Sequence, residues 1–349
     1  MELTTNDTND AVAQFWRDFV ALEPSLKGLS SRERFDKANE VLATYFSDIA
    51  LEMAGSPEHE PMEMIFTAHG VRDRFPLVME LVAGAPTLQY HQVVAFRQRM
   101  ANPERFAFRM MDNPFELSAE KMSFACEADG GQVGLYLKFD FEVPYDMRNR
   151  IQNMAYITLD HVLGEYDFAV KTGFVEFDLS EEQQQRLTWT PLGQLPAIFD
   201  RFWRGVSGYT GVFPVGEERR WCGLRAETDD GELLVTVHDS ARNVAMRADL
   251  GWVTRLQIDV ADNGLETVQD LQDEIDAYLE SQREGVMAYS QLQAPFREAA
   301  YYSGDAAKTE RLIRQALQRA GIEQFELNSE YDPSWQQYFG YAVHVPRDA

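Results

Sequence analysis

Three ionisable residues stand close together in the stretch LDHVLGEYD, namely Asp160, His161 and Glu165. A carboxylate beside a histidine is a common arrangement for moving a proton. The stretch ends a predicted helix, and at about 100° per residue the side chains of Asp160 and His161 diverge. We therefore expect Asp160 to face solvent and Glu165 to lie at the exit of the helix, with no shared catalytic role.

A second candidate is His69, which follows a predicted strand in the stretch TAHGVRD. Ligands are sometimes held where a strand turns into a helix, although a residue in such a turn needs no function. One alternative interpretation is a hydrolase or transferase with carboxylate chemistry in a cleft between two domains. It would use His69, Glu165 and Glu330, and it predicts a deep pocket with at least two displaced pKa values.

The stretch APFREAAYYSG predicts a strand with polar groups on both faces. Period-two alternation places Arg297 and Tyr301 on one face, and Glu298 and Tyr302 on the other. Polar residues on a central strand indicate a sheet face that is not wholly packed. That open face could bind a partner or dock the other domain, and we favour docking of the other domain.

Aromatic residues gather in SEYDPSWQQYFGY, residues 329 to 341. Asp332-Pro333 should end the last strand, after which Trp335, Tyr338 and Phe339 recur at helical spacing. Such rings either close a core or anchor an interface. We expect the segment to fold back over the open sheet, and exposure at an interface is the alternative. The candidate binding residues are Arg297, Tyr301, Glu330, Trp335 and Tyr338.

Sequence motifs for the common enzyme classes are missing. No phosphate-binding loop, dinucleotide fingerprint, nucleophile elbow or zincin motif occurs. The histidines are scattered and neither cysteine has a partner at metal-ligand spacing, so we predict no metal and no cofactor. These residues are His59, His69, His91, His161, His238, His344, Cys126 and Cys222.

The chain is strongly acidic, with 32 Lys plus Arg against 57 Asp plus Glu in 349 residues and a net charge of −25. Nucleic-acid binding depends on basic side chains that release counterions, so direct binding to nucleic acid is disfavoured. The same negative field would attract a basic protein, or would serve only to keep the protein soluble. Two isolated cysteines, an acidic N-terminus and no apolar run of about 18 residues predict a cytoplasmic protein without membrane contact.

Hydrophobic periodicity predicts an α+β fold. The first half should hold a capped helix over 31–53, strands over 61–67 and 88–96 around a helix over 72–83, and a hairpin turning on Asp129-Gly130. A helix over 147–163 and a strand over 168–179 should follow. We take residues 1–204 as an N-terminal α+β sandwich with leading helices, 205–214 as a linker, and 215–349 as a second domain.

The second half begins with a hairpin on Asp230-Gly231 and continues in the order β-α-β-β-α-β, which is the ferredoxin-like pattern. Its predicted helices carry opposite charge, since 266–283 is mostly acidic and 305–320 mostly basic. The predicted strands span 252–260, 286–293, 296–302 and 322–329. Two helices on one face of a sheet would bring those opposite charges together.

Several stretches resemble an uncharacterised bacterial family, domain of unknown function six-nine-five. They are WCGLRAETDDGELLVTVHDS, WVTRLQIDVA, NGLETVQDLQDEIDAYL, FREAAYYSG and YDPSWQQYFG in the second half. MEMIFTAHG, VVAFRQRM and LDHVLGEYDF resemble the α+β domain often attached to that family. The resemblance implies an α+β fold, no assigned activity, and kinship with small acidic ferredoxin-like proteins that inhibit ribonuclease E.

Together these observations favour a non-catalytic acidic binding protein that docks a basic partner, as an inhibitor or immunity-like regulator. Negative charge would steer the encounter and aromatic anchors would hold the complex. The first alternative is the enzyme described above. The second is a structural or assembly protein, which would present a large apolar self-complementary patch.

Overall fold

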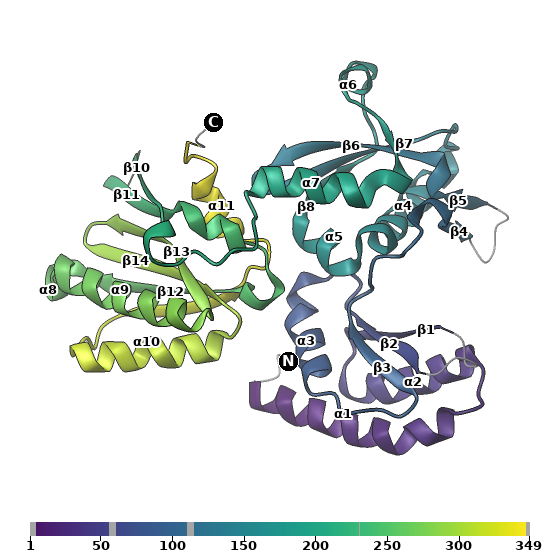
Figure 1. Ribbon diagram of the computed structural model, residues 1–349, viewed down its shortest axis with the longest axis horizontal. Helices are drawn as coiled ribbons and strands as arrows, with labels where there is room; N and C mark the ends of the chain where they lie inside the picture. Colours follow the sequence, from purple (N-terminus) through teal and green to yellow (C-terminus); the bar gives the residue numbers. More distant parts are fainter. Residues whose placement is uncertain (1–4, 56–60, 110–114, 230, 347–349) are drawn as a thin grey trace. The chain divides into compact units, whose positions relative to one another are not determined.

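The computed structural model describes residues 5–55, 61–109, 115–229 and 231–346, and its fold is mixed α+β (Figure 1). His59 and Asp230 lie outside the described residues. The chain forms two compact units that are interleaved in sequence. Unit 1 comprises Met1–Ala125, Leu137–Ala169 and Phe177–Pro196, whereas unit 2 comprises Cys126–Tyr136, Val170–Glu176 and Ala197–Ala349.

Unit 1 begins with helices packed on a three-stranded sheet of order β1-β2-β3. Strand β2 pairs antiparallel with β1 and parallel with β3. Phe15, Phe19 and Phe66 are fully buried there and form a T-shaped aromatic cluster with Trp16. The elements are α1 (Thr5–Leu26), α2 (Ser31–Tyr45), β1 (Ala50–Ala54), β2 (Met62–Thr67), α3 (Phe75–Ala83) and β3 (His91–Ala95).

The prediction of one helix over 31–53 is wrong after residue 45. The capping box of Ser30 and Glu33 begins α2 as predicted, but the helix ends at Tyr45 and Phe46 is already extended. The following residues form strand β1, in which Leu51 is buried and which pairs along its length with β2. Apolar residues at 49, 51 and 53 fit a strand as well as a helix, and sheet pairing decides the outcome.

The middle of the chain forms a four-stranded sheet of order β8-β7-β6-β9 and a two-stranded sheet of β4 and β5. The predicted strand over 168–179 is wrong at both ends, because its first residues continue a helix from Glu165 to Lys171 and only Thr172–Glu176 is extended. The elements are β4 (Ala107–Arg109), β5 (Glu116–Ser118), β6 (Met122–Asp129), β7 (Gln132–Phe139), α4 (Arg148–Leu163), α5 (Glu165–Lys171), β8 (Thr172–Glu176), α6 (Glu181–Arg186), β9 (Thr190–Pro191) and α7 (Leu195–Ser207).

Unit 2 is built on a six-stranded sheet of order β10-β11-β13-β14-β12-β15, in which neighbouring strands pair antiparallel. The predicted order of strands and helices after residue 215 is confirmed, with boundaries that shift by a few residues. The elements are β10 (Trp221–Thr228), β11 (Gly231–His238), β12 (Trp252–Asp259), α8 (Val260–Asn263), α9 (Leu265–Gln282), β13 (Gly285–Gln293), β14 (Phe296–Ser303), α10 (Ala306–Ala320), β15 (Glu326–Tyr331) and α11 (Gln336–Ala342).

Helices α9 and α10 lie side by side on one face of this sheet (Figure 1). They bury an apolar core that includes Leu256, Ile275 and Ile313. The predicted attraction between an acidic and a basic helix is confirmed by the pair of Arg319 with Glu274 at 2.7 Å, and Lys308 pairs with Glu284 just beyond the end of α9. Both pairs are exposed, so they select this arrangement of the helices and contribute little to stability.

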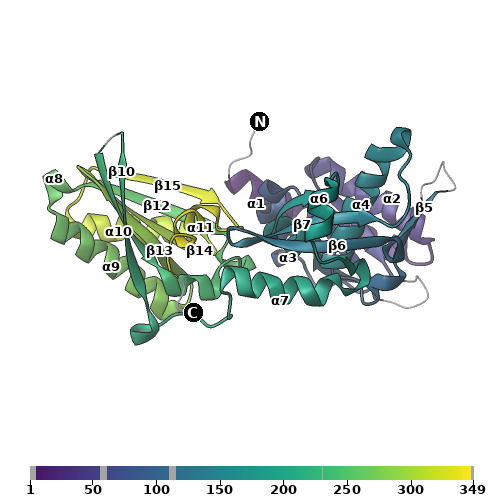
Figure 2. The ribbon, with the colours of Figure 1, turned by 90° about the horizontal axis from the view of Figure 1, so that it is seen from above.

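The C-terminal segment covers the other face of the sheet, where α11 lies opposite α9 and α10 (Figure 2). Trp335 stacks on Tyr302 of β14, and the hydroxyl of Tyr338 donates to the carbonyl oxygen of His238 at 3.0 Å. The ring of Phe339 lies against Gly131 at the tip of the β6-β7 hairpin. The prediction that this segment folds back over the sheet is therefore confirmed.

Candidate functional site

A groove of about 600 Å³ lies beside α9 in unit 2, on the helix side of the sheet. On this face of the sheet, helices α9 and α10 do not cover strands β10 and β11. Thr236 is therefore exposed, and Leu234 is 40% exposed. The groove is lined by Gly216, Arg219, Trp221, Thr236, Asp273, Ala277, Met287, Ser290 and Arg297. Its floor is therefore sheet and one wall is α9.

Arg219 links the segment that precedes β10 in the sequence to helix α9. Its guanidinium pairs with Asp276 and, at 2.9 Å, with Glu280, while the amide of Gly216 donates to Glu280 at 2.8 Å. The same guanidinium lies 5.3 Å from the ring centre of Trp221. This cation is thus already neutralised within the fold.

Arg297 is the other cation of the groove, and its contacts are neutral. Its Nε donates to the amide oxygen of Gln272 at 2.7 Å, and its Nη2 donates to the hydroxyl of Ser290 at 3.1 Å. Within the described ranges, no carboxylate lies at ion-pair distance from it. Burial lowers the pKa of Arg297, which attraction from Asp273 partly offsets.

An acidic ridge, formed by Glu266, Asp270 and Asp273, runs along the exposed side of α9 next to the groove. Spacings of four and three residues place these side chains on one face of the helix. In the part of the chain that the structure describes, no basic side chain forms an ion pair with any of the three. Glu266 and Asp270 therefore present charge that no described side chain pairs with, while Asp273 also attracts Arg297.

Asp276 is the buried carboxylate behind this wall. Burial raises its pKa to about 6, against the effects of a hydrogen bond from the amide of Met287 and of attraction by Arg219. His238, stacked on Trp221 with ring centres 4.3 Å apart, has a pKa lowered to about 4, chiefly by burial. Both groups support the groove from beneath.

The predicted binding residues separate into buried and accessible ones. Tyr301, Trp335 and Tyr338 are fully buried, so they cannot touch a partner, and the prediction of an aromatic binding face is wrong for them. The face with Tyr301 is not open either, because α9 covers it and the hydroxyl donates to the carbonyl of Gln272. Arg297 reaches the groove, and Glu330 on β15 lies near Arg255 and accepts from Gln337.

Unit 1 holds a charged cluster around Arg97. The guanidinium makes two hydrogen bonds to Glu52, at 3.0 and 2.9 Å, and pairs with Asp160. The expectation that Asp160 faces solvent is wrong, because this residue is only 8% exposed. Burial opposes charge on Glu52, but hydrogen bonding and attraction from Arg97 lower its pKa overall. The helix exit is thus fixed by ion pairs.

Glu165 serves as an acceptor for backbone amides. It is fully buried and accepts from Ala68 at 2.9 Å, Gly70 at 3.1 Å and Arg97 at 3.1 Å. His69 reaches the same cluster, with its Nδ1 at 3.2 Å from Nη2 of Arg97. The structure therefore brings His69 and Glu165 together in unit 1, whereas Glu330 belongs to unit 2. Glu165 is occupied in holding the backbone, which leaves little capacity for acid–base chemistry.

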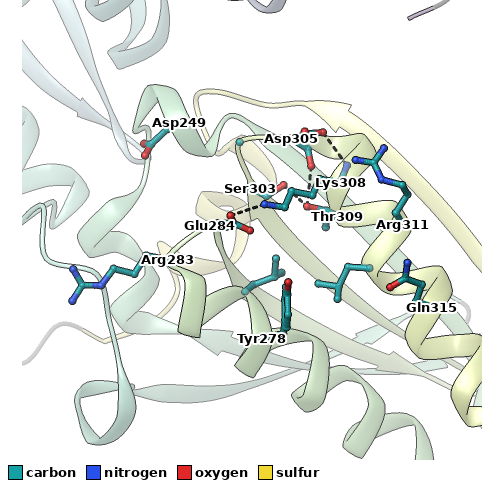
Figure 3. A pocket seen from close by; sticks show the side chains of 13 residues that line it. Asp249, Tyr278, Arg283, Glu284, Ser303, Asp305, Lys308, Thr309, Arg311 and Gln315 are labelled. Carbon is teal, nitrogen blue, oxygen red and sulfur yellow. Dashed lines mark hydrogen bonds and ion pairs between the residues drawn. The ribbon is translucent and has the colours of Figure 1, made fainter. Parts of the chain in front are cut away.

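A second cavity of unit 2, about 590 Å³, lies between the end of α9 and the start of α10. Figure 3 shows Lys308 reaching Glu284, and Thr309 reaching Ser303. The carboxylate of Asp305 accepts from the amide of Lys308 at the start of the helix. These groups satisfy one another, so this cavity offers a ligand less than the groove beside α9 does.

Sequence reasoning missed Arg97, Arg219 and Asp276. Arg97 and Arg219 follow stretches without a recognisable motif, and Asp276 is one of many acids in an acidic helix. The helical period could have found Asp276, because it lies one residue after the buried Ile275 and on the same side of α9 as Leu279. The partners of both arginines are distant in sequence.

Among the described residues, no group of three or more His, Cys, Asp or Glu side chains is arranged to hold a metal ion. In those same ranges, no helix has the length and apolar character needed to cross a membrane. Comparison with protein-family models, with curated proteins and with solved structures found no match to this chain.

Proposed function

We propose that the protein is a non-catalytic acidic binding protein that docks a basic protein partner through the groove and the acidic ridge of α9. The observation that carries this proposal is the ridge itself, where three exposed carboxylates lie along one helix face without ion-pair partners among the described residues. Opposite charge on a partner would speed the encounter and fix its orientation. A regulator or inhibitor of a basic protein fits this chemistry.

Apolar residues next to the ridge could stabilise the complex after the partner has associated. The uncovered face of β10 and β11 adds the half-buried ring of Trp221 and the exposed side chain of Leu234. A partner that covers these residues would gain about 25 cal/mol for each Å² of apolar surface removed from water. Charge would thus bring the partner in, and apolar contact would hold it.

A ferredoxin-like fold for unit 2 belongs to the same proposal. Taking β12, β13, β14 and β15 as strands one to four, the sheet runs 4-1-3-2, and both helices lie on one face. This arrangement supports the split β-α-β pattern. The β10-β11 hairpin then extends the sheet beyond the helices, which is why the groove exists.

The two alternatives have weaker support. An enzyme would need free acid or base groups, but Glu165 already accepts three backbone hydrogen bonds. An assembly protein would need to associate with itself, which a net charge of −25 opposes.

A lysine-rich peptide of about ten residues provides a direct test. Its affinity would be measured by fluorescence anisotropy for the wild type, for a ridge variant (Glu266→Gln, Asp270→Asn, Asp273→Asn) and for a matched unit 1 variant (Glu63→Gln, Glu120→Gln, Glu182→Gln). Both variants lose three exposed charges. We expect the ridge variant alone to weaken binding by at least about tenfold. Equal weakening in the two variants would reject the ridge as the site.

A further inference from the structure

Arg297 is a half-buried cation that forms no ion pair with the described residues, although Asp273 attracts it from beyond ion-pair distance. Its two hydrogen bonds go to the uncharged oxygens of Gln272 and Ser290. The third guanidinium nitrogen, Nη1, has no hydrogen-bond partner in the described part of the chain. Charged groups withdrawn from water are ordinarily paired, so this position offers a place for an anion.

Gln272 holds Arg297 in place beside the groove. Its side chain is fully buried, and its Nε2 has no hydrogen-bond partner within the described residues. The oxygen of this side-chain amide accepts a hydrogen bond from Arg297. The N–H groups without a hydrogen-bond partner are on the same amide. An unsatisfied buried donor costs free energy comparable to a lost hydrogen bond. Gln272 does not line the groove, so its amide fixes the direction of Arg297, and the guanidinium is the group that a negatively charged oxygen in the groove would contact.

The surroundings decide what kind of molecule can carry that oxygen. Asp273 lines the same groove, and the ridge continues from it through Asp270 to Glu266. A free anion would be repelled by these carboxylates and by a net charge of −25. A negatively charged group at Arg297 must therefore belong to a ligand that is otherwise cationic. A basic polypeptide whose C-terminal carboxylate is free is such a ligand.

The length of the ridge favours a polypeptide over a free amino acid. Glu266 precedes Asp273 by seven residues, which is about 10 Å along a helix. A single basic amino acid could use Arg297 and Asp273 but would leave the rest of the ridge unused. A volume of about 600 Å³ is within the usual range for a small ligand and can take one terminal residue.

We propose that Arg297 binds the C-terminal carboxylate of the basic partner, while basic side chains of the partner's last residues lie along Glu266, Asp270 and Asp273. This inference rests on the proposed function and specifies which end of the partner is recognised. Arginine binds a carboxylate through two parallel hydrogen bonds, which lysine cannot reproduce.

The test compares a lysine-rich peptide with a free C-terminus, the same peptide with an amidated C-terminus, and free lysine. We expect the free acid to bind the wild type about tenfold more tightly than the amide. Arg297→Met should abolish this preference, and Arg297→Lys should restore part of it. Arg314→Met removes an exposed arginine of α10 and should leave the preference unchanged. Circular dichroism would confirm that each variant is folded.

Equal binding of acid and amide to the wild type would overturn the role of Arg297 but leave the proposed function intact. A preference that persists in a folded Arg297→Met protein would do the same. Free lysine that binds as tightly as the peptide would replace the polypeptide by an amino acid and contradict the inference. Failure of both peptides to bind would reject the proposed function together with this inference.

Discussion

The indole ring of Trp335 stacks on the ring of Tyr302, with centroids 4.0 Å apart and an angle of 20° between the ring planes. The indole N–H donates to the carbonyl of Leu250 at 2.9 Å, and the hydroxyl of Tyr302 donates to Asp332 at 2.6 Å. Both rings are fully buried. The sheet face opposite α9 and α10 is therefore closed by the chain itself, which leaves the groove side for a partner.

Replacement of Trp335 by alanine should destabilise unit 2 by about 3 to 5 kcal/mol, because it removes a fully buried aromatic side chain and its hydrogen bond. Tyr278→Ala is the control, since this ring on α9 is 48% exposed. Denaturant unfolding followed by tryptophan fluorescence and circular dichroism measures both. Similar stability of the two variants would show that the C-terminal segment does not close the sheet.

Gly131→Ala should cost about 1 to 3 kcal/mol, because an added Cβ would lie 2.5 Å from three atoms of the Phe339 ring. Gly223→Ala on β10 meets no atom within 4 Å and should change stability by less than about 0.5 kcal/mol. Thermal unfolding of the two variants is the measurement. A harmless Gly131→Ala would contradict the packing of the β6-β7 tip against α11.

In unit 1, Glu165→Gln should lower stability by about 2 kcal/mol or more. The amide keeps only one acceptor oxygen where the carboxylate accepts three backbone N–H groups. Glu63→Gln on β2 removes an exposed carboxylate and should have little effect. Hydrogen exchange at the amides of Ala68, Gly70 and Arg97 would report the loss locally. Unchanged protection at these amides would argue against this role for Glu165.

Asp276 predicts a pH dependence of stability with an unusual sign. Its pKa is about 6 in the fold and 3.8 when unperturbed, because burial disfavours the charged form. Between these values the folded protein holds a proton that the unfolded chain lacks, so the free energy of unfolding falls as pH rises through this window. The total effect is about 3 kcal/mol.

Asp276→Asn removes this dependence. The unfolding free energy of the wild type minus that of the variant should therefore decrease between about pH 4 and about pH 7, since other carboxylates cancel in the difference. Urea titrations over that range measure it. A difference that stays constant, or that grows with pH, would mean that attraction by Arg219 outweighs burial.

Much of unit 2 is predictable from sequence because its elements are long and regular. The capped helix α10 and the break at Asp332 both follow local rules. The stretch around Ile49 to Met53 fits two periods, and the choice between them is made by pairing with β2. Residues 168–171 are predicted to begin a strand, but they belong to helix α5, which starts after Gly164.

The candidate site is less predictable because it depends on contacts between distant residues. Alternation correctly put Arg297 and Tyr301 on one face, but it could not show that α9 covers Tyr301 and leaves Arg297 at the groove. Spacing on a helix suggested that Asp160 is exposed, whereas an arginine 63 positions earlier in the chain pairs with it. The acidic character of α9 is visible in sequence, whereas only the structure shows that none of the described basic side chains forms an ion pair with its ridge.

The most direct test of the account is hydrogen exchange resolved along the chain, with and without the lysine-rich peptide at about physiological ionic strength. We expect the peptide to slow exchange in Leu265–Gln282 and in the β10-β11 hairpin of the wild type, and to have no such effect on the ridge variant. Slower exchange confined to unit 1, or none anywhere, would contradict the claim that the groove beside α9 is the docking site.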